Sequence, residues 1–336
     1  MKKIFVTGCT GYIGSHTCVE LLQSGYDVIG IDNFSNSKPN VLDKIKIITG
    51  KEIKFYEGNM LDETLLNKIF VENNIDAVID FAAYKSVGGS VNIPIEYYIN
   101  NVSSVLTLLK VMKKHKVKSL IFSSSATVYG DVRVMPITEY FPIGGTTNPY
   151  GTSKLFCENI LSDLYKSDNE WNICIFRYFN PVGAHKTHLI GEEPSGIPAN
   201  LMPFISKVAT GELDCLNVFG NDYNTPDGTG VRDYIHIVDL AKAHIKGLER
   251  LDKDKKGMHI YNLSTGKGYS VLEMINAFER VNNIKINYKI VCRRPGDVAT
   301  SYANPEKAEK ELGWKAELGL DEMCYDAYEF TKGLNK

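Results

Sequence analysis

Short apolar segments alternate with amphipathic segments through the first half of the chain. The apolar segments are rich in valine and isoleucine, which is typical of strands buried on both faces of a parallel sheet. Strands are predicted over 4–7, 27–32, 53–57, 77–81, 119–123 and 173–178, and helices over 13–23, 61–72, 96–115 and 150–165. Because parallel strands need crossover connections, this pattern predicts an α/β fold with helices on both sides of a parallel sheet.

The pattern changes after Asn180, where glycine, proline and asparagine become frequent through 191–203 and 219–230. Further helices are predicted over 238–250, 271–281 and 305–312, and short strands over 258–263 and 286–290. We therefore predict two domains. Residues 1–180 would form the larger one, and 181–336 would form a smaller α/β substrate domain, allowing for segments that return to pack on the first.

The composition is that of an ordinary globular protein, because 43% of the 336 residues are hydrophobic and 23% are charged. A net charge of −2 gives no bulk positive field that would attract nucleic acid or an anionic membrane. No apolar run approaches the roughly 20 residues that span a bilayer. We expect a soluble protein that binds neither nucleic acid nor membrane.

The seven cysteines are odd in number, scattered and free of any C-x-x-C pair. Reduced thiols in a cytoplasmic protein explain this usage best. His185 and His188 are three residues apart, but they lie in a loop-like segment and no other histidine or cysteine cluster supports them. Because a closed metal site needs about four convergent ligands, we expect a cytoplasmic protein without a metal.

The segment "TGCTGYIG", Thr7 to Gly14, follows the first predicted strand directly. Gly8 would let the chain turn sharply, Gly11 would let backbone approach a pyrophosphate, and Gly14 would let the next helix lie close to the sheet. Glycines at such a turn also occur for packing reasons alone. With the parallel sheet, the motif favours a Rossmann-type doubly wound fold that binds a dinucleotide at a helix N-terminus.

Asp32 ends the second predicted strand, about 20 residues beyond the glycines, where a carboxylate accepts hydrogen bonds from an adenosine ribose. The same carboxylate would repel a 2′-phosphate, so NAD is favoured over NADP. The alternative is a solvated carboxylate at a strand end. Asn59, after the third strand, has the chemistry to contact adenine or to be an ordinary polar loop residue.

Tyr150 and Lys154 are four residues apart in a predicted helix, so they share one helical face. A nearby ammonium and a cationic nicotinamide would favour the phenolate of Tyr150, which could then take a proton from a substrate hydroxyl. Lys154 would also anchor the nicotinamide ribose, and Ser125 would hydrogen-bond the reacting oxygen. Taken alone, Y-x-x-x-K is a common accident; after the glycine turn and the serine run it predicts redox chemistry at a carbon bearing a hydroxyl.

Several motifs in order resemble the UDP-glucose 4-epimerase family of the extended short-chain dehydrogenase/reductase superfamily. They are "GYIGSHT", "SSSATVYGD", "RYFNPVGAH" and "GTGVRDYIHIVDLA", and the resemblance runs from Lys3 to beyond Trp314. It implies that NAD stays bound while carbon 4 of a UDP-hexose is oxidised to a ketone and reduced again on the opposite face. The net reaction would be an isomerisation in galactose and nucleotide-sugar metabolism, and the protein would be a homodimer built on helices 96–115 and 150–165.

The resemblance also assigns roles residue by residue. Tyr150, Lys154 and Ser125 match the catalytic groups. The positions that match cofactor contacts are Gly8, Gly11, Tyr12, Ile13, Gly14, Asp32, Asn33, Phe34, Ser35, Asn36, Ser37, Asn59, Met60, Phe81, Ala82, Ala83, Lys85, Asn100, Ser123, Tyr150, Lys154 and Phe179. The positions that match UDP-sugar contacts are Lys85, Ser125, Tyr150, Asn180, Asn200, Leu201, Phe219, Arg232, Tyr234, Arg294, Asp297 and Ser301. The family usually has aspartate where this chain has Asn59.

Two positions bear on the substrate and the reaction. Nucleotide-sugar 4,6-dehydratases carry an Asp-Glu pair after the serine run, whereas this chain has Ala126 and Thr127 and so lacks an acid–base pair for elimination. Ser301 falls where members restricted to UDP-glucose and UDP-galactose carry tyrosine. We expect the smaller side chain to admit the N-acetylated pair, UDP-GlcNAc and UDP-GalNAc. Two other functions stay open here: a binding module that keeps NAD, and a dehydrogenase that releases NADH.

Overall fold

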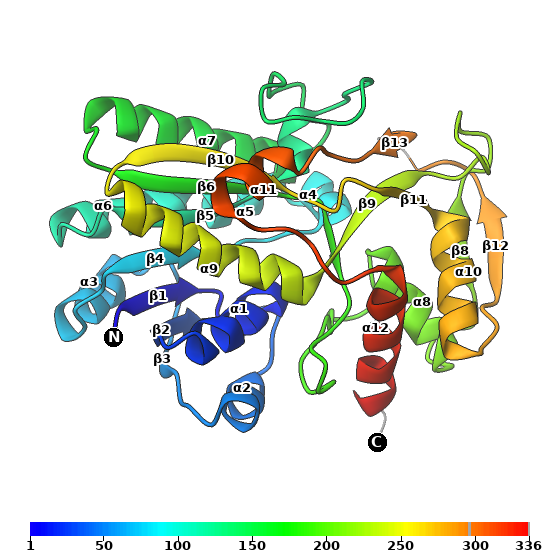
Figure 1. The fold of residues 1–336 in the computed structure, drawn as a ribbon, viewed down its shortest axis with the longest axis horizontal. Helices are drawn as coiled ribbons and strands as arrows, with labels where there is room; N and C mark the ends of the chain where they lie inside the picture. The colour runs from blue at the N-terminus through cyan, green and yellow to red at the C-terminus, as the bar shows by residue number, and fades with distance from the viewer. Residues whose placement is uncertain (295–296, 335–336) are drawn as a thin grey trace. The chain divides into compact units, whose positions relative to one another are not determined.

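The structure is a computed structural model that describes residues 1–294 and 297–334. Its largest sheet has seven strands in the order β10-β6-β5-β4-β1-β2-β3, and each pair from β6 to β3 is parallel (Figure 1). Its strands are β1 (Lys3–Thr7), β2 (Asp27–Asp32), β3 (Lys54–Glu57), β4 (Ala77–Asp80), β5 (Ser119–Ser125), β6 (Asn172–Tyr178) and β10 (Gly257–Leu263). The strand order reverses beside β1, as in a Rossmann-type sheet, and this confirms the predicted α/β fold.

Helices cover both faces of this sheet. They are α1 (Tyr12–Gln23), α2 (Val41–Thr49), α3 (Glu63–Glu72), α4 (Val87–Asn92), α5 (Pro94–Tyr98), α6 (Ser104–Lys114), α7 (Pro149–Ser167) and α9 (Ile237–Asp254). On one face, α3, α6 and α7 bury apolar side chains against strand residues such as Phe5, Val78 and Phe122. Figure 1 shows α1, α2 and α9 on the other side. The strands are therefore buried on both faces, which explains their nearly continuous apolar sequences.

The helix predicted over 96–115 is present, but it contains a turn of a different helical type that the sequence did not predict. A π-helical turn, Ile99–Ser103, separates α5 from α6. Its residue Asn101 is buried, and its side chain bonds the backbone N–H and carbonyl of Tyr84 at 2.8 and 3.0 Å. Single π turns inside helices often occur at functional sites. Here the turn directs a polar side chain to the loop that follows β4.

The second half of the chain forms smaller sheets with helices around them. Its elements are β7 (Asn180–Val182), α8 (Leu201–Ala209), β8 (Leu216–Phe219), β9 (Val231–His236), β11 (Gly268–Ser270), α10 (Val271–Asn282), β12 (Tyr288–Val291), β13 (Thr300–Ser301), α11 (Glu306–Leu312) and α12 (Leu320–Leu334). Strand β9 pairs with β7, β11 and β13, and β8 pairs with β12. A second apolar core lies among α8, α10 and α12, with Phe278 fully buried in it.

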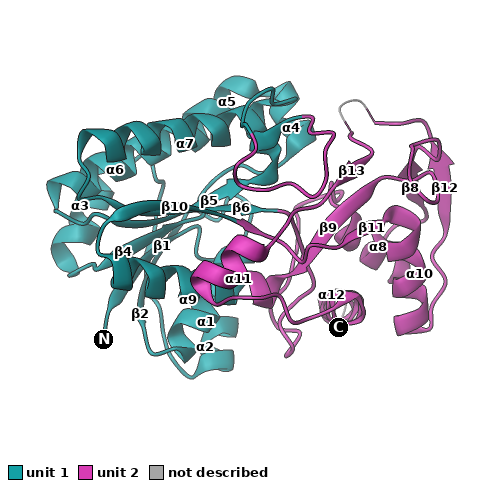
Figure 2. Cartoon of the chain, turned by 45° about the horizontal axis from the view of Figure 1, so that its top comes forward, with its two compact units in different colours: residues 1–130, 142–178, 241–261 teal, residues 131–141, 179–240, 262–336 magenta. Residues whose placement is uncertain are grey.

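The chain forms two compact units, coloured separately in Figure 2. The first comprises residues 1–130, 142–178 and 241–261, and the second comprises the remaining segments. Both units are discontinuous in the sequence, whereas the prediction placed the division at residue 180 and allowed later segments to return to the first domain. That division therefore stays a prediction about where cofactor and substrate residues lie.

The described residues contain neither a membrane-spanning helix nor a cluster of metal ligands. Within 1–294 and 297–334, no helix is long and apolar enough to cross a membrane. The same residues contain no group of three or more His, Cys, Asp or Glu side chains arranged to hold a metal ion.

Candidate active site

The glycine turn after β1 is closely packed. Gly8 has a φ of +62°, and a Cβ added there would lie 3.1 Å from the backbone nitrogen of Ala82. A Cβ on Gly14 would lie 2.1 Å from the carbonyl oxygen of Gly8. Only glycine fits either position, so the turn stays tight and α1 begins at Tyr12. The N-terminus of α1 is thus held at the carboxyl edge of the sheet, where such folds bind phosphate groups.

Asp32 is fixed beside this turn at the end of β2. Its carboxylate accepts hydrogen bonds from the backbone N–H of Thr10 at 3.1 Å, from that of Phe34 at 2.9 Å, and from the Ser37 hydroxyl at 3.2 Å. Phe34 adopts a positive φ of 55°. The carboxylate is therefore oriented before any ligand binds, and it ties the loop after β2 to the glycine turn.

A buried threonine–aspartate pair holds the ends of β1 and β4 together. The Thr7 hydroxyl donates to Asp80 at 2.6 Å and accepts from the backbone N–H groups of Phe81 and Ala82, both at 3.0 Å. Burial raises the pKa of Asp80. This arrangement positions the first residues after β4, which the sequence assigned to the cofactor site. The pairing itself was missed because its partners lie far apart in the sequence.

The other predicted cofactor residues of the first unit lie at the start of α1, in the π-helical turn and in the loops after β2, β3 and β4. Met60 is buried, whereas Asn59 is exposed and accepts from the backbone N–H of Leu61 at 2.9 Å. The Lys85 ammonium lies 5.8 Å from the centre of the Tyr12 ring. The remaining positions of this group are Ile13, Asn33, Ser35, Asn36, Ala83 and Asn100. Phe179 belongs to the second unit, where its N–H donates to Leu263.

Helix α7 carries Tyr150 and Lys154. Asn148 caps the helix by accepting from the backbone N–H of Gly151 at 2.9 Å. Lys154 is buried, and its ammonium donates to the carbonyl of Ser123 at 2.6 Å. Helix α7 is therefore attached to the end of β5, the strand that also carries Ser125.

The protonation of Tyr150 is governed by burial. Burial raises its pKa to about 12, and a hydrogen bond with the Ser125 side chain opposes this rise. Burial also lowers the pKa of Lys154. The sequence analysis expected the Lys154 ammonium to favour the Tyr150 phenolate, but in the structure burial and Ser125 set this pKa. A positive charge close to Tyr150 would favour the phenolate.

Ser125 is engaged by the turn that follows it. Residues Ala126–Tyr129 form a 3-10 turn whose N-cap is Ser125. The Ser125 hydroxyl oxygen accepts from the backbone N–H of Thr127 at 3.2 Å and from the Thr127 hydroxyl at 3.0 Å. Ala126 and Thr127 stand where the dehydratases carry their Asp-Glu pair. One of them, Thr127, therefore contacts the predicted catalytic group Ser125.

A buried ion pair lies one turn further along α7. Glu158 accepts two hydrogen bonds from Arg177 of β6, at 3.0 and 2.6 Å, and one from the Ser124 hydroxyl at 2.5 Å. Arg177 also donates to the Tyr129 hydroxyl at 2.8 Å. The side chains of both charged residues are 2% exposed, so each depends on the other. The sequence analysis did not identify this network, although Glu158 follows Lys154 at helical spacing.

In the second unit, four predicted substrate residues share one face of a sheet. Arg232 and Tyr234 are two apart on β9, so their side chains point the same way. Asn180 of β7 pairs with Tyr234, and Ser301 of β13 pairs with Arg232. Paired residues on adjacent strands present their side chains to the same face. The structure therefore brings these four together. Burial raises the pKa of Tyr234 to about 12.

Two arginines meet one carboxylate beside that face. Arg294 donates twice to Asp297, at 3.1 and 3.0 Å, and Arg232 lies 3.9 Å from an oxygen of the same carboxylate. The Arg294 guanidinium also lies 5.5 Å from the centre of the Phe219 ring. Two guanidinium groups near each other can bind a diphosphate through paired hydrogen bonds.

The last two predicted substrate residues begin α8. Asn200 precedes the helix and donates to Glu192 at 2.9 Å, and Leu201 packs against the second apolar core.

A residue that the sequence did not identify is Asp233, which lies between Arg232 and Tyr234 on the opposite face of β9. Its buried carboxylate accepts four hydrogen bonds, two of them from Thr265, and burial raises its pKa to about 6. Asp233 thus supports the sheet from behind.

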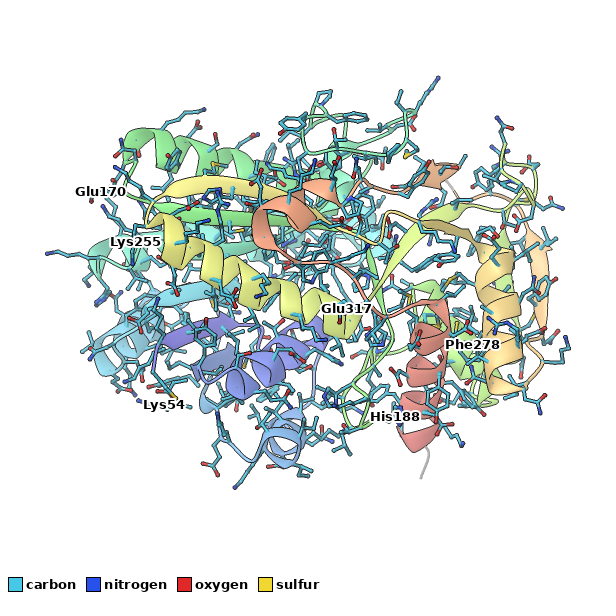
Figure 3. The ribbon with its side chains drawn as sticks, in the orientation of Figure 1. Lys54, Glu170, His188, Lys255, Phe278 and Glu317 are labelled. Atoms are coloured by element: carbon cyan, nitrogen blue, oxygen red, sulfur yellow. The ribbon has the colours of Figure 1, made fainter. Side chains whose placement is uncertain are left out.

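His188, in the loop after β7, and His236, at the end of β9, share a partner that the sequence did not predict. His188 and His236 contact the two oxygens of Asp326 on α12, at 3.0 and 3.1 Å, and Figure 3 shows His188 beside this helix. His185 contacts Thr187 at 2.9 Å instead. Burial lowers the pKa of His185 to about 4. These groups bind the loop to α12 within the second unit.

The parallel sheet, the glycine turn and the Ser125, Tyr150 and Lys154 group define an enzyme of the short-chain dehydrogenase/reductase class. A family model described as GDP-mannose 4,6 dehydratase matches residues 5–327. A Haemophilus influenzae protein named UDP-glucose 4-epimerase is 59% identical over 98% of this chain and 97% of its own. The chain belongs to the UDP-glucose 4-epimerase family, whose members are isomerases.

Solved structures agree with this assignment. The UDP-glucose 4-epimerase from Bifidobacterium longum, in complex with NAD+ and UDP, has a TM-score of 0.96 and 57% identity, covering 99% of this chain and 98% of that one. The UDP-Glc/GlcNAc 4-epimerase from Campylobacter jejuni has a TM-score of 0.86 and 31% identity, covering 99% and 100%.

Proposed function

We propose that this protein interconverts UDP-glucose and UDP-galactose by inverting carbon 4 through a 4-keto intermediate, with NAD held throughout. The observation that carries the proposal is the attachment of Lys154 and Tyr150 on α7 to the serines at the end of β5. Relatives of the same length are named for this activity. We also propose the setting expected from the sequence: a cytoplasmic enzyme of galactose and nucleotide-sugar metabolism.

The residues present fit NAD. Gly8 and Gly14 leave no room for a Cβ, so the backbone and the α1 N-terminus are close enough together to receive a pyrophosphate. Asp32 is already oriented by Thr10, Phe34 and Ser37, which suits it to accept from a ribose hydroxyl. When bound, NAD would accept the hydrogen of carbon 4 with its electron pair and return it to the opposite face of the ketone.

The chain itself would move the proton. Tyr150 would take it from the carbon-4 hydroxyl during oxidation and give it back during reduction. Ser125 would hydrogen-bond the same oxygen, and Lys154, held by Ser123, would bind the nicotinamide ribose. Because burial raises the pKa of Tyr150 to about 12, the enzyme needs the cofactor's positive charge to populate the phenolate at neutral pH.

The second unit would bind the UDP part. Arg232 and Arg294 would clamp the diphosphate. Asp297, which is hydrogen-bonded to Arg294 and forms an ion pair with Arg232, would accept from the uridine ribose. Asn180, Asn200, Leu201, Phe219 and Tyr234 would complete the nucleotide and sugar contacts. No acid–base pair stands at 126–127, so we propose epimerisation without the dehydration that the family model's description names.

We further propose that the N-acetylated pair, UDP-GlcNAc and UDP-GalNAc, is also converted. Ser301 is small and pairs with Arg232 on the face that carries the proposed substrate residues. A relative from Campylobacter jejuni is named for both sugar types. We also propose a homodimer, in which exposed apolar side chains on the α4–α7 layer of each chain face each other.

The decisive experiment incubates purified protein with each of the four UDP-hexoses, without added NAD, and separates the products by chromatography. Interconversion within both pairs is expected. Denaturation of the protein should release NAD, which mass spectrometry would identify. Failure to convert UDP-glucose or UDP-galactose would contradict the main proposal. Failure on the acetylated pair alone would contradict only the broader specificity.

Tyr150→Phe tests whether the protein is an enzyme rather than a binding module. The variant should lose about 10²–10⁴-fold in turnover, since only the proton-transfer group is removed. Its melting temperature and bound NAD should be unchanged. Unchanged turnover would overturn the mechanism, and accumulation of reduced cofactor with the wild-type protein would indicate a dehydrogenase instead.

A further inference from the structure

The Ser125 oxygen accepts two hydrogen bonds, and its proton is available to be donated in a third. A serine hydroxyl has one donor and two acceptor positions. The backbone N–H and the hydroxyl of Thr127 both donate to the Ser125 oxygen, at 3.2 and 3.0 Å. Both acceptor positions are thus used by a single residue, and the Ser125 proton is left to be donated elsewhere. The Ser125 side chain lowers the pKa of Tyr150, which places the two hydroxyl groups near each other.

We propose that Thr127 is a positioning residue that orients the Ser125 hydroxyl, so that its proton points toward the Tyr150 oxygen and the reacting oxygen of the substrate. This inference rests on the proposed epimerase function and deepens it. It gives position 127 a role in proton transfer that acts through Ser125.

Thr127 is itself held firmly relative to both groups. It lies in the turn that directly follows Ser125, so its backbone bond fixes the distance to that residue. On the other side it faces the start of α7, where a Cβ added to Gly151 would lie 3.2 Å from the Thr127 Cβ and 3.3 Å from its hydroxyl oxygen. Gly151 follows Tyr150, so the glycine lets the Tyr150 turn approach Thr127 closely.

Loss of the Thr127 hydroxyl would free one acceptor position on Ser125. The Ser125 hydroxyl could then rotate and spend part of its time donating away from Tyr150. Because the Ser125 bond lowers the pKa of Tyr150, weakening it would raise that pKa further. A smaller share of the enzyme would carry the phenolate at neutral pH, and turnover would fall. Substrate binding through the second unit's arginines would not change.

Two variants separate the hydroxyl from its packing. Thr127→Val keeps the shape of the side chain and removes the hydroxyl, whereas Thr127→Ser keeps the hydroxyl and removes a methyl group. We expect the valine variant to lose about two- to twelvefold in kcat, the worth of one hydrogen bond, with KM within about twofold. The rising limb of its pH–rate profile should move to higher pH. The serine variant should match the wild type in both.

A double-mutant cycle tests whether Thr127 acts through Ser125. In a Ser125→Ala background, Thr127→Val should cause no further loss of kcat, since the oriented hydroxyl is already gone. Additive losses would overturn the inference. Thr127→Ala, which also lacks the hydroxyl, replaces the valine variant if that protein does not fold.

Other outcomes are equally clear. A valine variant with wild-type kcat and pH profile overturns the inference, and so do valine and serine variants that are equally impaired, because that result would indicate packing. If the wild-type protein itself converts no UDP-hexose, the proposed function fails and this inference fails with it. An active wild type with an unaffected valine variant contradicts the inference alone.

Discussion

Ser301 is the side chain on which the proposed range of substrates depends. It sits on β13 opposite Arg232, in a strand of two residues that adds to the edge of β9. The pairing of β13 with β9 therefore sets the face of the sheet on which the Ser301 side chain lies. The side chain could move to the other face, away from Arg232, only if this pairing were broken. Any larger side chain placed here would extend over the same face.

Replacement of Ser301 by tyrosine should remove activity on the acetylated sugars selectively. We expect Ser301→Tyr to lower kcat/KM for UDP-GlcNAc by at least about tenfold, because a steric clash with an added group costs roughly 1–3 kcal/mol. Activity on UDP-glucose should stay within about threefold. Ser301→Ala is the matched control and should retain both activities. Equal losses on both sugars would show that position 301 does not separate them.

At the scale of elements, the junction of β5 with α7 is held by two successive polar contacts. Lys154 bonds the carbonyl of Ser123, and Glu158 bonds the hydroxyl of Ser124. Arg177, whose strand position pairs with Ser124, completes the charge balance of Glu158. The junction thus fixes the end of β5, which carries Ser125, relative to α7, which carries Tyr150.

Removal of the Glu158 charge should destabilise the protein strongly. Glu158→Gln leaves Arg177 buried without its counter-charge, which costs about 3–5 kcal/mol. Thermal or urea unfolding would measure this loss. Glu170→Gln is the matched control, since Glu170, labelled in Figure 3, forms an exposed ion pair with Lys118 that is worth at most about 1 kcal/mol. Equal stabilities of the two variants would contradict the assigned role of the network.

How much of such a junction the sequence predicts depends on how far apart the contacting residues lie along the chain. Gly8, Asp32, Tyr150 and Lys154 were identified because each belongs to a short motif at fixed spacing from a strand end. The bond between Thr7 and Asp80 joins residues 73 positions apart, and no local pattern reports it. The π turn in the 96–115 segment was missed for the same reason. Its residue Asn101 forms hydrogen bonds with the backbone of Tyr84, which lies in another loop.

At the scale of the whole molecule, exposed apolar side chains gather on one layer of the first unit. Helix α7 packs beside α4, α5 and the π turn, and these elements carry the exposed residues Val91, Ile95, Ile99 and Phe156. Exposed apolar side chains occur singly on most proteins, but a cluster marks an interaction surface. This layer contains the helices that the sequence analysis proposed for a dimer.

A charge placed on this layer should separate the dimer. We expect the wild-type protein to elute as a dimer in size-exclusion chromatography with light scattering, and Ile95→Glu to elute as a monomer. Ile47→Glu on α2 is the control, because Ile47 is 70% exposed and Ile95 is 69% exposed. A monomeric wild type would contradict the proposed dimer. A dimeric Ile95→Glu variant would place the interface elsewhere.

The position of β10 has a consequence for engineering. This strand forms the edge of the seven-stranded sheet beside β6, yet about 80 residues of the chain separate the two, and most of them belong to the second unit. A chimera that exchanged everything after residue 180 would therefore replace β10 of the host's own sheet, together with the whole of α9. A transplant of substrate specificity between relatives must instead be cut around 131–141, 179–240 and 262 onward, leaving 241–261 with the recipient.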